Sequence, residues 1–239
     1  MKKIGILAAM DTEISHFEKV FPAEKVIHRG NGDFKIANNI IYVKCGIGKV
    51  HAAIATQILC DMGVTHLINT GIAGALHPAL KIFDMVVSSD AVQYDVDVTP
   101  FNYPPMQIPG CNQSFPADDF LIGCANSAAK AMKLPLENFD SNSSHETTES
   151  RIFTGRIATG DKFVSNLSLK NEIRNFSNGV CVEMEGGAVA QVAHLNACPF
   201  VIIRCISDMA AEDTAEYKFN EATAGDLSAR FVEKMLDFI

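Results

Sequence analysis

Short apolar runs alternate with segments of helical periodicity along the whole length of this chain. The apolar runs have the length of buried strands and occupy residues 3–9, 40–44, 66–70, 84–88, 152–159, 180–182 and 199–206. Helical patterns lie at 11–20, 49–62, 118–132, 165–175, 185–195 and 221–239. This alternation predicts an α/β protein with three α/β/α layers around a mixed sheet. A polar tract at 140–150 reads as an exposed insertion, and we expect one domain over residues 1–239.

Composition and charge exclude several classes of function. Hydrophobic residues make up 48% of the chain and charged residues 20%, which rules out wholesale disorder. The net charge of −8 would repel the phosphates of duplex nucleic acid and an anionic membrane surface. No apolar run approaches the roughly 18 residues that a membrane-spanning helix needs. We therefore expect a partner that is neither nucleic acid nor membrane.

The first residues and the cysteines indicate a cytoplasmic protein. Lys2 and Lys3 precede an apolar stretch, as in a signal peptide, but the stretch contains Gly5, stops at Asp11 and lacks a small-x-small cleavage site. The seven cysteines are scattered and odd in number, which fits reduced thiols better than a disulfide framework.

Several well-known motifs are absent from the sequence. The segment 46–51 (GIGKVH) begins like a dinucleotide fingerprint, but His51 stands where the third glycine belongs, and the features of a P-loop are missing. No G-x-S-x-G motif occurs. The histidines form no H-x-x-x-H or H-x-H pair and no C-x-x-C exists, so we expect no transition-metal site.

Polar residues follow several of the predicted strands, where open α/β sheets bind their ligands. They are Glu13, Asn69, Thr70, Glu183, Glu185, Arg204, Ser207 and Asp208, and Gly71 and Gly74 would let a ligand approach the backbone. Glu13 could equally compensate a helix dipole, and Asp208 could be a helix N-cap. Arg204 is harder to explain structurally, because a guanidinium inside an apolar run needs a carboxylate or an anionic ligand.

The proline-rich stretch 100–116 is too apolar for a solvated linker. It contains Phe101, Tyr103, Met106 and Phe115, so we expect it to pack against something.

Eight segments, taken in order, resemble one enzyme family. They are 5–13 (GILAAMDTE), 45–50 (CGIGKV), 69–74 (NTGIAG), 94–99 (YDVDVT), 107–110 (QIPG), 160–163 (GDKF), 182–185 (VEME) and 204–208 (RCISD). The chain resembles a 5′-methylthioadenosine/S-adenosylhomocysteine nucleosidase of the nucleoside phosphorylase superfamily. The resemblance implies a doubly wound fold whose mixed sheet curls into a partial barrel, a homodimer and no cofactor. It also implies hydrolysis of the adenine–ribose bond of these nucleosides, with 5′-deoxyadenosine as a further substrate, in methionine salvage.

The resemblance assigns catalytic roles to three residues. Asp208 would protonate adenine N7 as the general acid, held in place by Ser207, and its burial would favour the protonated form that this role needs. Glu13 would bind and activate the attacking water. Arg204 would help to hold that water and keep Glu13 ionised.

The resemblance also assigns a binding pocket. Glu185 would accept hydrogen bonds from the ribose hydroxyls, Met184 would pack under the sugar, Phe163 would stack on adenine and the backbone of Val164 would read the edge of the base. Met10, Ile47 and Phe219 would form the apolar pocket around the sugar and its 5′-substituent, and Gly74 and Glu183 are further binding residues. Val98, Phe101, Tyr103 and Pro109 would enter the site of the neighbouring protomer. Taken alone, Phe163, Met184 and Ile47 would read as ordinary core residues.

Two positions depart from the family pattern, and three alternative functions stay open. Ile72 stands where many relatives carry a serine that contacts the water or the sugar, so one hydrogen bond is missing unless the backbone replaces it. Cys45 also replaces a frequent serine. A phosphorylase, a futalosine-type hydrolase and a sensor that binds adenosine without cleaving it are the alternatives. The presence of both Glu13 and Asp208 argues against the sensor, and the preferred 5′-substituent stays open.

Overall fold

A computed structural model describes residues 2–139, 150–210 and 220–239. The elements are β1 (Ile4–Ala8), α1 (Asp11–Val20), β2 (Lys25–Arg29), β3 (Gly32–Ala37), β4 (Ile40–Lys44), α2 (Lys49–Asp61), β5 (His66–Ala75), β6 (Met85–Gln93), the short 3₁₀ helix η1 (Thr99–Phe101), β7 (Phe115–Pro116), α3 (Asp119–Ala131), β8 (Leu136–Glu137), β9 (Ile152–Thr159), α4 (Leu167–Ser177), β10 (Cys181–Glu183), α5 (Gly186–Leu195), β11 (Phe200–Asp208) and α6 (Glu221–Leu236). The predicted insertion at 140–150 lies outside the described residues, apart from Ser150.

The strands of the described residues form one mixed sheet that closes on itself at one end. Its order is β10-β9-β6-β11-β5-β1-β4-β3-β2, with β7 beside β6 and β8 beside β9. β10 also pairs with β5, antiparallel, through Cys181 with Ala75 and Val182 with Gly74. The five strands β10, β9, β6, β11 and β5 therefore make a closed barrel, and the predicted mixed, partly barrel-like sheet is confirmed.

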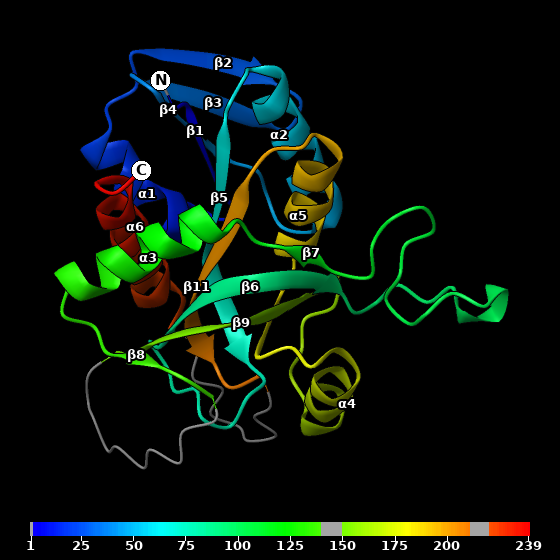
Figure 1. The fold of residues 1–239 in the computed structure, drawn as a ribbon. Coiled ribbons are helices and arrows are strands. Elements are labelled where there is room, and N and C mark those ends of the chain that lie inside the picture. Colours follow the sequence, from blue (N-terminus) through cyan, green and yellow to red (C-terminus); the bar gives the residue numbers. More distant parts are fainter. Residues whose placement is uncertain (1, 140–149, 211–219) are drawn as a thin grey trace.

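Helices cover the sheet from two sides (Figure 1). On one side α6 packs against both α1 and α3, and on the other α2 and α5 pack together. β11 is buried along all nine of its residues, because helices and neighbouring strands enclose it. This arrangement confirms the three α/β/α layers. None of the helices among the described residues is long and apolar enough to span a bilayer.

The β2–β3 hairpin is an element that the sequence analysis did not predict. Most β2 side chains are exposed, so β2 lacks the apolar run that marks the buried strands. The signal that could have found the hairpin is its turn, residues 30–32 (GNG), where Gly30 has φ +60°. The predicted strands at 66–70 and 84–88 are also longer in the structure, because β5 and β6 continue along the barrel.

The apolar positions that predicted helix α2, Val50, Ile54 and Ile58, divide between its two faces. Val50 and Ile54 are exposed, whereas Ile58 and Leu59 are buried together with Ala52 and Ala55. The helix is confirmed, and its apolar outer face is available for another contact.

Candidate active site

A pocket of about 280 Å³ opens at the carboxyl ends of β1, β5, β10 and β11. It is lined by Ala9, Met10, Glu13, Ile47, Ile72, Ala73, Gly74, Lys162, Phe163, Val164, Val182, Glu183, Met184, Glu185, Ser207, Asp208 and Glu221. Most of the residues that the sequence predicted as a site therefore meet in one cavity. Its position follows the rule that open α/β sheets bind ligands where strands end.

Glu13 reaches back from the first turn of α1 to the ends of two strands. Its Oε2 accepts hydrogen bonds from the N–H groups of Ala9 (2.8 Å) and Met10 (3.0 Å), and its Oε1 accepts one from the N–H of Ile72 (3.0 Å). Burial raises the pKa of Glu13, while the charge of Arg204 and these three N–H groups oppose the rise. The carboxylate caps its own helix and also faces the pocket.

The backbone of Ile72 takes part in the site, although its side chain cannot donate a hydrogen bond. The N–H of Ile72 holds Glu13 from β5, and the side chain lines the pocket. The N–H of Ile72 is thus bonded to Glu13, and the position offers no side-chain donor to a bound water or sugar.

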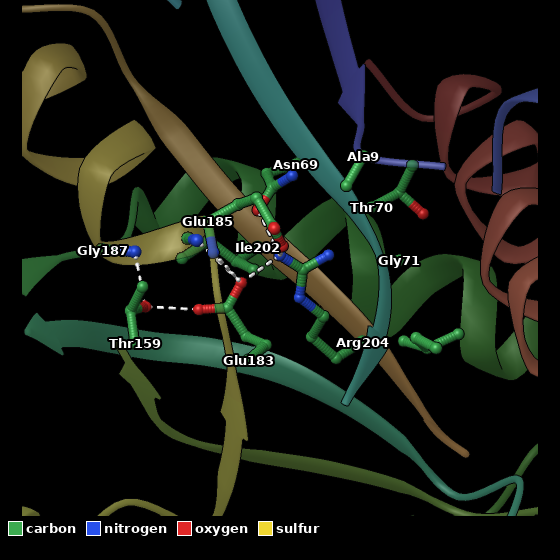
Figure 2. A network of polar contacts seen from close by, with 12 residues as sticks. Ala9, Asn69, Thr70, Gly71, Thr159, Glu183, Glu185, Gly187, Ile202 and Arg204 are labelled. Carbon is green, nitrogen blue, oxygen red and sulfur yellow. Dashed lines mark hydrogen bonds and ion pairs between the residues drawn. The ribbon is translucent and has the colours of Figure 1, made fainter. Parts of the chain in front are cut away.

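Arg204 lies behind the pocket at the centre of a buried polar network (Figure 2). Only 1% of the residue is exposed, and its Nη2 donates to Asn69 Oδ1 (2.6 Å) and to the carboxylate of Glu183. A second carboxylate oxygen, Glu185 Oε2, lies 3.6 Å from the same nitrogen. Burial alone would lower the pKa of Arg204, but the carboxylates of Glu183, Glu185 and Glu13 raise it above the ordinary value. The expected carboxylate partner of Arg204 is thus Glu183.

The charge of Arg204 opposes the rise in the pKa of Glu13, in the direction expected of a group that keeps Glu13 ionised. Among the described residues, Arg204 donates hydrogen bonds to Asn69 and Glu183. Its interaction with Glu13 is electrostatic, without a hydrogen bond. The two side chains meet over Gly71, where an added Cβ would collide with Arg204 Nη1 and Glu13 Oε1. Arg204 Nε has no hydrogen-bond partner among the described residues. A glycine at position 71 is what lets both charged groups approach β5.

Glu183 borders the pocket, but its carboxylate is occupied by protein donors. It accepts from Thr159 Oγ1 and Arg204, and from the N–H groups of Glu185 (3.0 Å) and Gly186 (2.7 Å) at the start of α5. These contacts fix the junction between β10 and α5 (Figure 2). The sequence placed Glu183 among the binding residues, and in the structure its carboxylate positions its neighbours.

Glu185 stands at the N-cap of α5 and points toward the start of α2. Its Oε1 accepts a hydrogen bond from the N–H of Gly48 (2.8 Å). Burial and then the neighbouring Glu183 charge raise its pKa to about 8, although Arg204 opposes this. Its position on the pocket wall leaves it able to accept hydrogen bonds from a bound hydroxyl.

Asp208 ends β11 and is buried at the opposite part of the pocket. Ser207 Oγ donates to its Oδ2 (2.9 Å), and the N–H of Ala210 donates to its Oδ1 (2.8 Å). In the strand register Asp208 pairs with Gly74 of β5, so the backbone leaves room for the carboxyl. Ser207 therefore contacts Asp208 as the sequence predicted.

The apolar walls come from both halves of the chain. Met10, Ile47, Phe163, Val164 and Met184 all line the pocket, with Val164 buried and Phe163 exposed at the mouth. Flat apolar walls suit a heteroaromatic base, and the carboxylates between them suit hydroxyl and amino groups.

Some predicted residues lie elsewhere. Val98, Phe101, Tyr103 and Pro109 belong to the long segment between β6 and β7, which extends away from the body of the chain (Figure 1). They do not line the pocket of their own chain. Phe219 lies outside the described residues.

Five residues that line the pocket were not predicted from the sequence, namely Ala9, Ala73, Lys162, Val182 and Glu221. Ile72, which the sequence marked only as a departure from the family pattern, lines it too. Most of them adjoin a predicted residue within a motif, so adjacency was the available signal. Glu221 is the exception, because it reaches the pocket from α6 and accepts a hydrogen bond from Thr12 Oγ1 (3.0 Å).

Comparison with known proteins gives a consistent result. The model of the phosphorylase superfamily matches residues 3–237. A 5′-methylthioadenosine/S-adenosylhomocysteine nucleosidase of Halalkalibacterium halodurans is 37% identical over 97% of this chain and 96% of its own length. Two solved structures have TM-scores of 0.87. One is the Neisseria meningitidis enzyme of the same name in complex with methylthio-immucillin-A, at 32% identity and full coverage of both chains. The other is futalosine hydrolase of Helicobacter pylori, at 30% identity, covering 100% of this chain and 98% of its own.

The resemblance seen in eight short motifs thus extends over almost the whole sequence and the whole fold. The chain belongs to the phosphorylase superfamily and, within it, to the family of 5′-methylthioadenosine/S-adenosylhomocysteine nucleosidases, which are hydrolases of N-glycosyl bonds.

Proposed function

We propose that this protein hydrolyses the adenine–ribose bond of 5′-methylthioadenosine and S-adenosylhomocysteine, and also of 5′-deoxyadenosine, in methionine salvage. The observation that carries the proposal is one pocket with two buried carboxyl groups on different sides, Asp208 and Glu13. Asp208 ends β11 and Glu13 contacts β1 and β5, with β5 between β11 and β1. The carboxyl group of Glu13 lies at Gly71 of β5 and that of Asp208 at Gly74. Three residues of a strand span about 10 Å, which leaves room for a glycosidic bond and a water. The family match over residues 3–237 supports one catalytic domain.

Asp208 is the proposed general acid. Cleavage of an N-glycoside needs a base that leaves as a neutral molecule, so a proton must reach adenine N7 as the bond breaks. Ser207 and the N–H of Ala210 fix the two oxygens of Asp208 and leave lone pairs directed at a ligand. The same carboxyl can contact the exocyclic amino group of adenine.

Glu13 is the proposed base that activates water. Its raised pKa makes it a better proton acceptor than an exposed glutamate, and three N–H groups fix its direction. The nearby positive charge of Arg204 keeps enough of it ionised to act. Attack by this water would complete the exchange of adenine for a hydroxyl at the sugar.

The remaining pocket residues bind the nucleoside. Glu185 accepts the ribose hydroxyls, Met184 packs under the sugar, and Phe163 stacks on adenine beside the backbone of Val164. Met10 and Ile47 surround the 5′-substituent. Each of these residues lines the pocket, which supports their joint role.

A homodimer with shared sites completes the proposal. Phe101 is 75% exposed on the segment between β6 and β7, and Val50 is 70% exposed on the outer face of α2. Phe163 at the pocket mouth is 59% exposed. Contact between two copies through these groups would bury them and would bring Val98, Phe101, Tyr103 and Pro109 to the partner's pocket.

Water, not phosphate, is the proposed acceptor. The turn after β1 presents Glu13 to the pocket, and a carboxylate would repel a phosphate charge by about 4 kcal/mol at about 4 Å if the effective dielectric constant is about 20. Arg204 cannot offset this, because its guanidinium is engaged by Glu183. The products should be free adenine and a reducing sugar.

Chromatography of the products, with and without phosphate, tests the proposal. We expect adenine and 5-methylthioribose at a rate that does not depend on phosphate. A sugar 1-phosphate as the main product would contradict it and favour a phosphorylase. Because futalosine hydrolase of Helicobacter pylori has the same fold, futalosine should be assayed in parallel with the two thioadenosines. Higher kcat/KM for futalosine would make that activity the principal one.

A further inference from the structure

Three residues outside the proposed catalytic set form a closed ring of polar contacts beside the pocket. Lys49 Nζ lies 2.6 Å from Asp95 Oδ1, and Asp95 Oδ2 accepts a hydrogen bond from the N–H of Asp161 (3.0 Å). Asp161 Oδ1 then accepts one from the N–H of Lys49 (2.9 Å), which closes the ring. The ring ties together the start of α2, the end of β6 and the turn after β9.

We propose that Lys49, Asp95 and Asp161 are positioning residues for the nucleoside site, which hold Glu185 and Phe163 in place for the sugar and the base. The inference rests on the function proposed above. None of the three is among the residues that line the pocket. They act through the backbone next to residues that do.

The first link leads from the ring to Glu185. Gly48, directly before Lys49, has φ +98° and gives its N–H to Glu185 Oε1 (2.8 Å). The first two N–H groups at the start of α2 thus bind two carboxylates, Glu185 and Asp161, where the helix dipole favours negative charge. A Cβ on Gly48 would lie 3.2 Å from Asp161 Oδ1, so the ring packs closely against this turn. If the ring opens, the backbone at Gly48 is no longer held in place, and the N–H that orients Glu185 can move away from it.

The second link leads to Phe163. Asp161 stands two residues before Phe163, and both its N–H and its carboxylate belong to the ring. Tyr94, next to Asp95, adds a hydrogen bond from its hydroxyl to the carbonyl of Lys162 (3.3 Å). Two hydrogen bonds, one from the N–H of Asp161 to Asp95 and one from Tyr94 to the carbonyl of Lys162, therefore hold the turn that carries Phe163 against the segment after β6. Because Phe163 is exposed at the mouth, this backbone attachment matters for where its ring lies.

The ring is more sheltered than an ordinary surface ion pair. The side chains of Lys49 and Asp95 are 19% and 15% exposed. A purely structural role would therefore lower the melting temperature when the ring is broken, with no specific change in binding. A positioning role would change substrate affinity instead.

Lys49→Met tests the proposal, with Lys49→Arg as the conservative variant and Lys234→Met as the matched control. Lys234 forms an exposed pair with Asp237 (2.8 Å) near the end of α6, away from the pocket. We expect Lys49→Met to raise the KM for 5′-methylthioadenosine about tenfold with a smaller change in kcat. Lys49→Arg should recover most of this, and Lys234→Met should behave as the parent. A parental KM in Lys49→Met would overturn the proposal, whatever the melting temperature.

Binding measurements separate the two links and do not depend on turnover. The Kd of adenine reports on Phe163, and we expect it to rise in Lys49→Met. For an adenine nucleoside analogue without ribose hydroxyls, the loss of affinity should be smaller than for one that has them, because Glu185 makes no contact with the former. Equal losses for both analogues would exclude the link to Glu185. Asp161→Asn, at an exposed position, should repeat the pattern and replaces Lys49→Met if that variant does not fold.

A parent protein that does not cleave the thioadenosines would contradict the proposed function. Unchanged adenine and nucleoside affinities in the ring variants would contradict this inference. The two failures are therefore distinguishable.

Discussion

Three buried carboxyl groups, those of Glu13, Glu183 and Glu185, line the pocket in front of one buried guanidinium, and their different partners give them different properties. Glu183 binds Arg204 directly and is surrounded by donors, whereas Glu13 and Glu185 interact with Arg204 mainly through charge. Burial first, and then the charge of Glu183, raises the pKa of Glu185 to about 8, and the single positive charge of Arg204 opposes this only in part.

Replacement of Glu185 by glutamine should change how stability depends on pH. The pKa of Glu185 is raised from 4.5 to about 8 on folding. Its contribution to the free energy of unfolding is therefore fully present below 4.5 and is lost as the pH rises to about 8. Glutamine does not ionise, so the melting temperature of Glu185→Gln relative to the parent should increase between pH 5 and pH 9. Thermal unfolding at several pH values measures this, and a constant difference would contradict it.

Asp208→Asn should abolish turnover and leave nucleoside binding largely intact. The amide keeps the shape and the contact with Ser207 but cannot protonate N7, and loss of a general acid costs roughly 10²–10⁴-fold in rate. Single-turnover kinetics and calorimetric titration with 5′-methylthioadenosine would measure the two effects. Hydrolysis near the parental rate would show that Asp208 is not the acid.

The sequence was sufficient to predict most of the pocket residues, but not which of them contact one another. Glu13, Glu185 and Asp208 stand directly after strands, and this position alone made them candidates. That Arg204 pairs with Glu183 depends on the register of β10 with β9, which sets Glu183 opposite Thr159. The N–H that Ile72 gives to Glu13 likewise depends on how α1 folds back over β5. These are tertiary contacts that no local pattern encodes.

At the scale of elements, β5 is the strand on which the site depends most. It pairs with β1, β11 and β10, and it carries Asn69, Gly71, Ile72 and Gly74 past the pocket. The sequence predicted only its first half, because glycines interrupt the apolar run in the second. Those interruptions are where charged groups from other elements approach the strand.

Gly71→Ala should therefore impair the site. Its new Cβ would displace Arg204 and Glu13, so we expect kcat/KM to fall at least about 100-fold, as for other misplaced catalytic groups. Gly123→Ala is the matched control, because it is an exposed position of α3 with nothing within 4 Å of the added Cβ. That control should keep full activity and gain up to about 1 kcal/mol of stability from helix propensity. Full activity of Gly71→Ala would contradict the arrangement described here.

At the scale of the whole molecule, we predict a dimer whose activity requires assembly. Phe101→Asp should yield a monomer with at least about tenfold lower kcat/KM, because a desolvated aromatic anchor at an interface typically contributes more than 1 kcal/mol. Light scattering together with activity measurement checks this. Val26→Asp is the control, because Val26 is also an exposed apolar residue but lies on β2. It should leave the oligomeric state and kcat/KM unchanged. A fully active monomer at assay concentration would exclude shared sites.

The closure of the barrel has a consequence for the behaviour of the protein at high concentration. Because β10 is paired on both sides, that end of the sheet offers no long row of free backbone groups to another copy. The other end is β2, which pairs only with β3 among the described strands. Lys25 and Arg29 lie exposed at its two ends, where charged side chains oppose pairing with a second β2 strand, and Arg29 also pairs with Asp61 (3.2 Å). We therefore expect the tendency of this protein to associate through β-strands at high concentration to depend on the charged side chains of β2.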